Sequence, residues 1–352
     1  MCRYPKILLC FISLSFLIVS LIIQIITFAD SKNREACNES LNTQKAITKL
    51  QQAIKINPYN PLYHANLGLL YEKLNLIDNA ITHFQKAYTL NPNDAGFCFN
   101  LGLLYQQIGD VDRAILSFEK ANRIDMNNII SLIHLGMSYE KLHQIVKSEK
   151  VYTQVLVYTP DILDSQFFTD LKTRNNSLFY SIMKNAQVQL EHNIEKRDPL
   201  QIARLGKILL AQGNISKAKT LLETSISILP NLNRPYLYLG QIALFNKDSI
   251  VAKNYFEKAV ALDPSDIFAI WNLSQIEKNN PMKRQLYYSS IVYIMDHHIS
   301  NRYNRNVNIY GTSSLVRTEI ANCMENYIQP KLDITTIRQF VMEHSNPKAI
   351  LK

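Results

Sequence analysis

The side chains best suited to chemistry in this sequence recur at a fixed spacing and do not gather in one motif. Asn66, Asn100 and His134 follow one another at equal intervals, and each lies two positions before a glycine. An asparagine side chain both donates and accepts hydrogen bonds, so a row of such residues can hold the backbone of an extended peptide. The spacing therefore predicts a binding surface. A solvated polar helix face without a ligand would show the same pattern.

We expect this surface to continue along the chain at two positions in each repeat, the second lying two turns of helix after the first. The residues predicted to line a partner-binding groove are Asn66, Lys73, Asn100, Gln107, His134, Lys141, Arg204, Tyr238 and Asn272.

Signs of catalysis or metal binding are missing from the sequence. Asp296, His297 and His298 are consecutive, but adjacent histidines on a helix point about 100° apart and do not easily bind one metal ion. The chain has no HExxH, GxSxG, P-loop or GxGxxG motif. We therefore predict that the protein is not an enzyme and uses neither a metal nor another cofactor.

The elements that must position the candidate residues follow a repeat with a period of about 34 residues. Leu67-Gly68, Leu101-Gly102 and Leu135-Gly136 coincide in this step, and Leu205-Gly206 and Leu239-Gly240 continue it in a second array. Each unit then carries a small, a large and a second small residue, which in the first full unit are Ala80, Phe84 and Ala87. Most units close at a proline, namely Pro58, Pro92, Pro160, Pro230 and Pro264.

This pattern predicts pairs of antiparallel helices. The glycine lets the second helix approach the first closely, and the proline after each unit stops the second helix. One such hairpin cannot bury its apolar face alone, so that neighbouring hairpins must stack. The predicted fold class is an all-α solenoid.

The period, the Leu-Gly pair, the aromatic Tyr71, the two small residues and the closing proline resemble the tetratricopeptide repeat. The resemblance implies an α-solenoid scaffold that binds a protein or peptide in a concave groove lined by the first helices. The tryptophan that opens the family's repeat is replaced here by His64, Cys98, Leu132, Ile202 and Tyr236.

The resemblance also argues against one ligand. Tetratricopeptide domains that grip the carboxylate end of a chaperone need paired lysine, arginine and asparagine side chains at five positions. The matching residues here are Ala65, Leu69, Asn100, Ile130 and His134, of which only the asparagine fits. A chaperone C-terminus is therefore not the expected partner.

The repeat register also sets the expected domain boundaries. Between the two arrays it slips, because the interval from Gly136 to Gly206 exceeds two full repeats by two positions. We expect a first array of a half repeat and three repeats at 43–162, an irregular helical hairpin at 163–198, a second array of two repeats and a capping helix at 199–280, and a helical segment at 281–352, with helices near 282–298, 313–327 and 333–344.

Residues 7–28 form a continuous apolar run without a charge. As a helix this run spans roughly the 30 Å hydrocarbon core of a bilayer, whereas cleavable signals have a shorter apolar region of about 7–15 residues. We predict one uncleaved transmembrane anchor, although Ala29 could end a cleavage site. Basic residues on both sides of the run leave its orientation open. We expect the soluble part outside the cytoplasm (periplasmic in a bacterium); a receptor displayed to the cytosol is the alternative.

The net charge of +9 is spread along the chain, so nucleic acid is not an expected partner. A second, diffuse resemblance suggests another function. An apolar span followed by repeats resembles the last membrane helix and repeat tail of bacterial O-antigen ligase or polymerase-type proteins. That resemblance implies a non-catalytic accessory or detached portion of a cell-envelope polysaccharide system.

Overall fold

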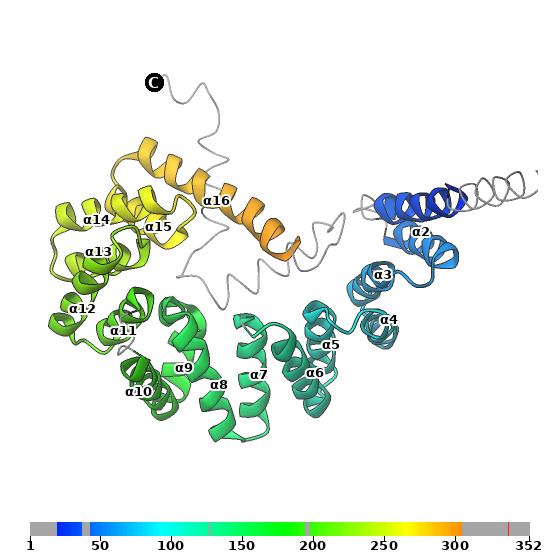
Figure 1. Cartoon of the computed structure of the whole chain (residues 1–352), viewed down its shortest axis with the longest axis horizontal. Coiled ribbons are helices and arrows are strands. Elements are labelled where there is room, and N and C mark those ends of the chain that lie inside the picture. The colour runs from blue at the N-terminus through cyan, green and yellow to red at the C-terminus, as the bar shows by residue number, and fades with distance from the viewer. Residues whose placement is uncertain (1–19, 37–42, 127, 194–197, 305–336, 338–352) are drawn as a thin grey trace, which may run out of the picture. The chain divides into compact units, whose positions relative to one another are not determined.

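The computed structural model describes residues 20–36, 43–126, 128–193, 198–304 and 337 (Figure 1). Helices provide the repeating structure in these parts of the chain. The chain divides into two compact units, Met1–Met126 with Arg302–Arg317 and Asn127–Asn301 with Thr318–Lys352. We describe each unit by itself.

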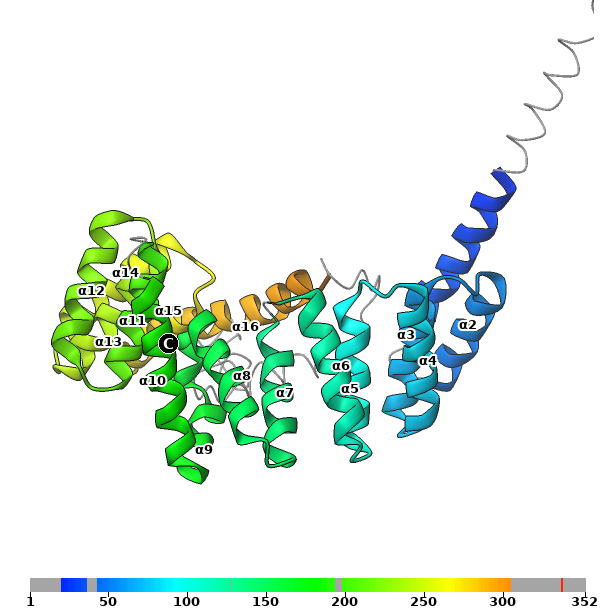
Figure 2. The same cartoon turned by 60° about the horizontal axis from the view of Figure 1, so that its bottom comes forward.

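The first unit stacks helical hairpins in chain order. Its described helices are residues 20–36, α2 (Thr43–Ile56), α3 (Pro61–Lys73), α4 (Ile77–Leu90), α5 (Ala95–Gln107) and α6 (Val111–Ile124). Figure 2 shows α3 beside α4 and α5 beside α6. Helix α4 also contacts α5, and α2 contacts α3, so that α2 and α4 each pack against the first helix of the next hairpin.

The second unit contains two groups of hairpins joined by a less regular one. Its helices are α7 (Ile129–Lys141), α8 (Ile145–Tyr158), the short 3-10 helix η1 (Pro160–Asp164), α9 (Gln166–Arg174), α10 (Asn176–Asn193), α11 (Pro199–Ala211), α12 (Ile215–Ile228), α13 (Asn233–Phe245), α14 (Ser249–Leu262), α15 (Ile267–Ile276) and α16 (Pro281–Asn304).

The predicted close packing at the repeat glycines is confirmed. A Cβ atom added to Gly68 would lie 2.8 Å from Cδ2 of Phe84 on the second helix of the same hairpin. The equivalent glycines face a large second-helix side chain in the same way: Gly102, Gly136, Gly206 and Gly240. Ala80 and Ala87 are completely buried on that second helix. The closely packed helical hairpins predicted from the sequence are therefore present in the described residues.

The helix ends follow from local chemistry. Asn60 and Asp94 cap α3 and α5 by accepting hydrogen bonds from the backbone N–H groups of Leu62 (3.0 Å) and Gly96 (2.8 Å). Helix α4 ends at Leu90, two positions before Pro92, as the proline predicts. Inside each regular hairpin one turn residue adopts a positive φ: Asn75, Gly109, His143, Gly213 and Lys247.

The irregular hairpin consists of η1, α9 and α10. Helix α9 is short, and Ser165 caps it where η1 ends. Helix α10 contacts both α8 and α11 and so takes the place of a second helix. Its buried side chains, such as Ile182, join Phe168 and Leu171 of α9 in the hydrophobic core of the unit. The change of register falls within this hairpin.

Two regions add to the sequence-based expectations. The leading unit, expected as a second helix alone, also has a first helix, because residues 20–36 pack against α2 and α3. Helix α16 begins at Pro281, close to the expected start, and its Tyr288 ring stacks on Trp271 of α15 at a centroid distance of 6.1 Å. The helices expected at 313–327 and 333–344 lie outside the described residues, apart from residue 337.

In the parts of the chain with described placement, no helix has both the length and the apolarity needed to cross a bilayer. Residues 7–19 of the predicted transmembrane anchor lie outside those parts.

Candidate partner-binding site

The predicted groove residues lie on one face of each first helix. Positions i, i+3 and i+7 of a helix fall on the same side, so a third residue, one after the repeat glycine, joins each predicted pair. We call these triplets the inner stripe: Asn66, Leu69 and Lys73 on α3; Asn100, Leu103 and Gln107 on α5; His134, Met137 and Lys141 on α7; Arg204, Lys207 and Ala211 on α11; Tyr238, Gln241 and Phe245 on α13.

On α3, the inner stripe is partly covered by the helix of residues 20–36. Asn66 is only 5% exposed, and its Nδ2 donates a hydrogen bond of 2.8 Å to Asn33 Oδ1 on that helix. Leu69 is half-buried and Lys73 is exposed. Asn66 therefore supports the packing of the leading hairpin, whereas the other two residues of this triplet reach solvent.

On α5, all three residues of the inner stripe reach the surface. Asn100 is half-buried and donates a 2.7 Å hydrogen bond from Nδ2 to the Gly96 carbonyl of its own helix. Leu103 is half-buried, and Gln107 is exposed, with its Nε2 3.4 Å from Asn75 Oδ1 in the turn before α4. This triplet combines amide groups with an accessible apolar side chain.

On α7, in the second unit, the stripe is largely uncharged. His134 is 7% exposed, and burial lowers the pKa of its imidazole to about 4. The ring is therefore neutral near pH 7 and supplies no positive charge to an anionic partner. Lys141, at the end of the same stripe, is exposed.

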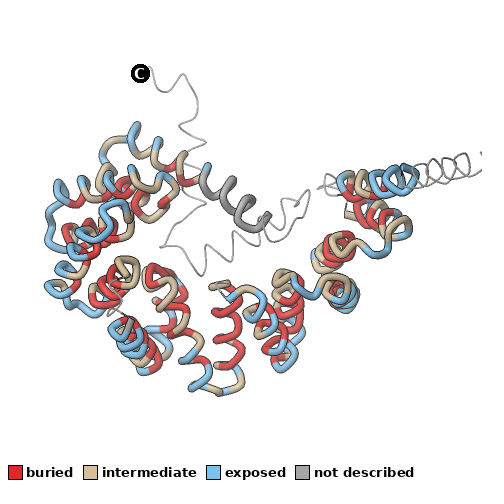
Figure 3. Tube along the Cα trace, in the orientation of Figure 1, coloured by how far each residue is buried: buried red, intermediate tan, exposed pale blue. Residues whose placement is uncertain are grey.

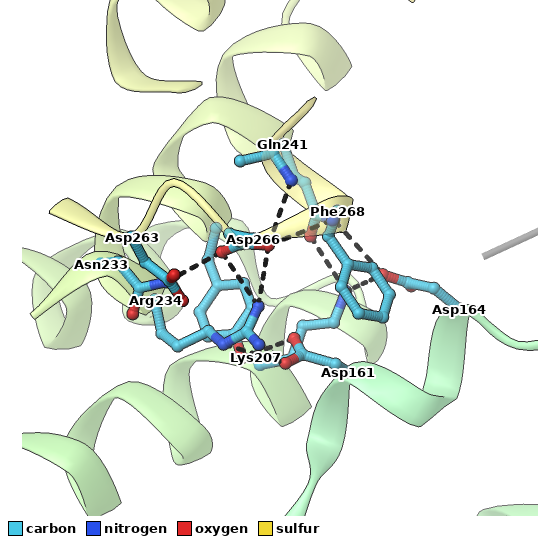
Figure 4. A network of polar contacts seen from close by, with 11 residues as sticks. Asp161, Asp164, Lys207, Asn233, Arg234, Gln241, Asp263, Asp266 and Phe268 are labelled. Carbon is cyan, nitrogen blue, oxygen red and sulfur yellow. Dashed lines mark hydrogen bonds and ion pairs between the residues drawn. The ribbon is translucent and has the colours of Figure 1, made fainter. Parts of the chain in front are cut away.

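On α11 and α13, η1 of the same chain contacts part of the inner stripe (Figure 4), whereas Ala211 and Phe245 at its end are exposed. Lys207 Nζ lies 2.7 Å from Asp164 Oδ2 and 2.9 Å from Gln241 Oε1. The Tyr238 hydroxyl donates a 2.7 Å hydrogen bond to Asp161 Oδ1. Two aspartates from one short turn thus bind polar side chains on two successive first helices.

Arg234 extends this network to the start of α15. Its Nε lies 3.3 Å from Asp161 Oδ2, and one of its terminal nitrogens lies 3.2 Å from Asp266 Oδ2. Asn233 Nδ2 donates to the same Asp266 oxygen at 2.9 Å. Asp266 also caps α15 by accepting the backbone N–H groups of Phe268 and Ala269. One guanidinium group therefore joins η1, α13 and α15.

The titration of these groups follows from their burial and their partners. Burial alone would lower the pKa of Arg234, but Asp161 and Asp266 outweigh it, so that the pKa is raised and the charge retained. Burial also raises the pKa of Asp266, an effect that Arg234 opposes. Burial raises the pKa of Tyr238 well above its usual value, so its hydroxyl keeps the proton that it donates to Asp161.

The remaining predicted residues of the second unit offer little to a partner. Tyr238 is 1% exposed beneath η1. Arg204 is half-buried, and burial lowers the pKa of its guanidinium. Asn272 donates a 2.7 Å hydrogen bond from Nδ2 to the Phe268 carbonyl of its own helix. A binding role for the nine predicted residues remains a prediction.

Sequence reasoning missed the residue that follows each repeat glycine. That residue is apolar in α3, α5 and α7 (Leu69, Leu103 and Met137) and polar in α11 and α13 (Lys207 and Gln241). The signal was present in the sequence, as was the acidic pair Asp161 and Asp164 after Pro160. Among the side chains with described positions, no three histidine, cysteine, aspartate or glutamate residues gather as metal ligands would.

Comparison with protein families identifies the repeats. A model described as TPR repeat matches residues 42–75, and models described as tetratricopeptide repeat match residues 61–94, 95–128 and 234–266. No curated protein sequence matches the chain.

Several solved structures are similar to the chain. MamA is 19% identical and aligns over 56% of this chain and 95% of its own, with a TM-score of 0.26. YrrB, described as a TPR protein with an unusual peptide-binding site, is 19% identical over 63% of this chain and 95% of its own, with a TM-score of 0.26. A tetratricopeptide repeat protein from Parabacteroides merdae is 16% identical over 72% of this chain and 99% of its own, with a TM-score of 0.35.

Proposed function

We propose, from the tetratricopeptide repeats that the chain carries, that it is a non-catalytic scaffold whose first helices bind a protein or peptide partner. A stack of such hairpins presents a long, regular surface and, in the described residues, no group of side chains arranged for catalysis.

The observation that carries this proposal is the accessibility of the inner stripe on α5. Leu103 is partly accessible between the amide side chains of Asn100 and Gln107, and Leu69 has the same place on α3 beside the exposed Lys73. Apolar side chains gain free energy on burial against a partner, and amide groups can bind the partner's backbone. Since η1 already binds Lys207, Tyr238 and Gln241 of the stripe on α11 and α13, we assign the partner to α3 and α5.

The same reasoning limits the partner's chemistry. Ala65 and Ile130 are buried where a carboxylate clamp would need cations, so a chaperone C-terminus is not proposed. Nucleic acid is not proposed either, because the inner stripe of α3 and α5 contains a single cation, Lys73.

We further propose that residues 7–28 attach this scaffold to a membrane, with the repeats outside the cytoplasm. The support is the uncharged run in the sequence, together with the exposure of large apolar side chains throughout residues 20–28. Nothing in the described residues favours the accessory role in polysaccharide assembly over this scaffold.

Site-specific photo-crosslinking tests the assignment of the partner to the stripe. A photoreactive amino acid replaces Gln107 on α5 or, as a control, Leu116, which is 54% exposed on α6. In membranes of cells that express the chain naturally, we expect Gln107 to capture a partner protein and Leu116 to capture none. Leu103→Asp should abolish capture from position 107, whereas Leu116→Asp should leave it intact. Capture from position 116 alone would overturn the proposal.

A further inference from the structure

One helix of the first unit changes its surroundings halfway along its length. Residues 20–36 form a continuous helix, drawn in dark blue in Figure 2, and its N-terminal half projects past α2. Figure 3 shows that exposed residues dominate that half and that buried residues appear only in the C-terminal half.

The C-terminal half is part of the repeat stack. Ala29 is completely buried and Ala36 is 4% exposed, and both belong to the hydrophobic cluster formed with α2 and α3. The hydroxyl of Tyr63 on α3 donates to Asp30, and Asn33 accepts the 2.8 Å hydrogen bond from Asn66. Residues 29–36 therefore supply the first helix of the leading hairpin.

Charged side chains begin where the helix joins the repeat stack. Glu35 pairs with Lys32 at 3.2 Å and with Lys49 of α2 at 3.1 Å. Lys32 Nζ also lies 5.3 Å above the Phe28 ring. From Asp30 onward the helix thus carries charged groups, whereas the residues just before it carry none.

The N-terminal half carries no charge and is apolar except for one narrow face formed by Ser20, Gln24 and Thr27. All residues from 20 to 28 are exposed, and the large apolar ones among them are 41–56% exposed: Leu21, Ile22, Ile23, Ile25, Ile26 and Phe28. At about 100° per residue these side chains cover about 220° of the circumference of the helix. A surface helix of a globular protein typically has an apolar stripe of about 100° and charged residues on the opposite face. A much wider apolar surface without any charge is typical of a membrane span. The apolar run also extends without a charge back to Ile7 in the sequence.

We infer that residues 20–36 form one helix shared between a lipid bilayer and the repeat stack. Residues up to Phe28 lie in the hydrocarbon, and residues 29–36 are the first helix of the leading hairpin. This inference rests on the proposed membrane attachment. Because Ala29 belongs to the core of the hairpin, cleavage after it would remove a packed residue. The segment is therefore retained, and it holds the first unit at the bilayer surface.

Fluorescence of single labelled cysteines tests the bilayer boundary in the full chain reconstituted into phosphatidylcholine liposomes. The five native cysteines are first replaced by alanine. An environment-sensitive fluorophore is then attached at Ile22→Cys, Ile26→Cys or Arg34→Cys. We expect a blue-shifted emission that lipid-borne nitroxides quench at positions 22 and 26. At the exposed Arg34 position we expect a water-like emission that aqueous iodide quenches.

Spin labels at Ile26→Cys and at Gln52→Cys on α2 test the shared helix. A single narrow distance distribution is expected, and a Gly-Gly-Ser insertion between Phe28 and Ala29 should broaden it while membrane binding persists. The intact mass of the chain purified from membranes should show that residues 22–28 have not been removed.

The outcomes separate the inference from the proposed function. Water-like labels at 22 and 26, a broad distribution without the insertion, or a mature chain that begins at Asp30 would each overturn the shared helix. A chain that does not float with liposomes would overturn both the shared helix and the membrane attachment. Crosslinking of a partner from position 107, which tests the scaffold function, does not depend on any of these measurements.

Discussion

At the scale of single residues, a pair of histidines replaces the packing that a large aromatic residue would provide. His64 is 6% exposed, and its Nε2 lies 3.2 Å from the Pro58 carbonyl oxygen, which can only accept a hydrogen bond. The Nε2 atom therefore carries the proton, and Nδ1 of the neutral ring accepts from Nδ1 of His83 at 3.2 Å. The two rings stack at 5.5 Å, and Tyr71 stacks on His83.

This pair predicts a loss of stability in mild acid. Burial lowers the pKa of His64 and of His83 below the ordinary value of 6.5. At His64 the Pro58 carbonyl opposes this shift and Lys86 adds to it, and at His83 the facing imidazole adds to it. As the pH falls through 6.5, the unfolded chain therefore takes up protons that the folded chain does not, and the free energy of unfolding decreases. The decrease stops below the two lowered pKa values.

Urea unfolding followed by circular dichroism, at about pH 7.5 and about pH 5.5, measures this effect. The His64→Gln/His83→Gln double variant should lose less stability on acidification than the parent chain does. His143→Gln, at an exposed turn, should keep the parent's pH dependence. An identical pH dependence in the parent and the double variant would contradict the role assigned to the pair.

At the scale of elements, the short helix η1 covers part of the inner stripe on two first helices of the second unit. Its two aspartates bind side chains of α11 and α13, and Arg234 carries the network on to α15. The side chain of Asp266 is completely buried and that of Asp161 is 8% exposed. Removing one partner of a buried ion pair strongly destabilises the fold, because the other charge is left buried without compensation.

Removing Arg234 should therefore weaken the second unit. We expect Arg234→Met to lower the free energy of unfolding by about 3 kcal/mol. Arg174→Met is the matched control, because Arg174 pairs with Glu140 at 2.7 Å but is 48% exposed. Its effect should be about 0–1 kcal/mol. The chain has one tryptophan, Trp271 on α15, so its fluorescence in urea reports on this unit. Equal effects of the two substitutions would show that the buried ion pairs of Arg234 do not stabilise the second unit.

At the scale of the whole molecule, the chain consists of two units, each built from hairpins that contact their neighbours in sequence. In such stacks a local defect mainly affects the hairpins beside it, because most of the contacts of a hairpin are with its neighbours. The repeat glycines offer a way to place the same defect in successive hairpins of the second unit.

Valine at a repeat glycine should destabilise its hairpin by about 1–3 kcal/mol through overpacking. An added Cβ would lie 2.5 Å from Phe256 at Gly240 and 2.8 Å from Leu222 at Gly206. By hydrogen exchange and mass spectrometry, Gly240→Val should reduce protection in α13 and α14 and in the adjoining α12 and α15. Gly206→Val should shift the loss toward α10–α12. An equal loss throughout α7–α15 in both variants would show that this unit opens as one block.

The repeat positions show how much of the fold could be read from the sequence. Gly68 and Phe84 meet within one hairpin, and Ala80 and Ala87 are completely buried, so the repeat period alone is enough to predict this packing. The candidate site was predictable only in part. Lys73, Asn100, Gln107 and Lys141 lie on the stripe as expected and reach the surface, whereas Asn66 and Tyr238 are buried.

The sequence by itself determined the helices, their pairing and the face that each first helix presents, because these depend on spacing along the chain. Only the tertiary structure decided which parts of that face remain accessible. The contacts that cover it, Asn33 with Asn66 and Asp161 with Tyr238, come from segments without the repeat signature. Their side chains meet the stripe only after the stack has formed, so no local pattern in the sequence predicts them.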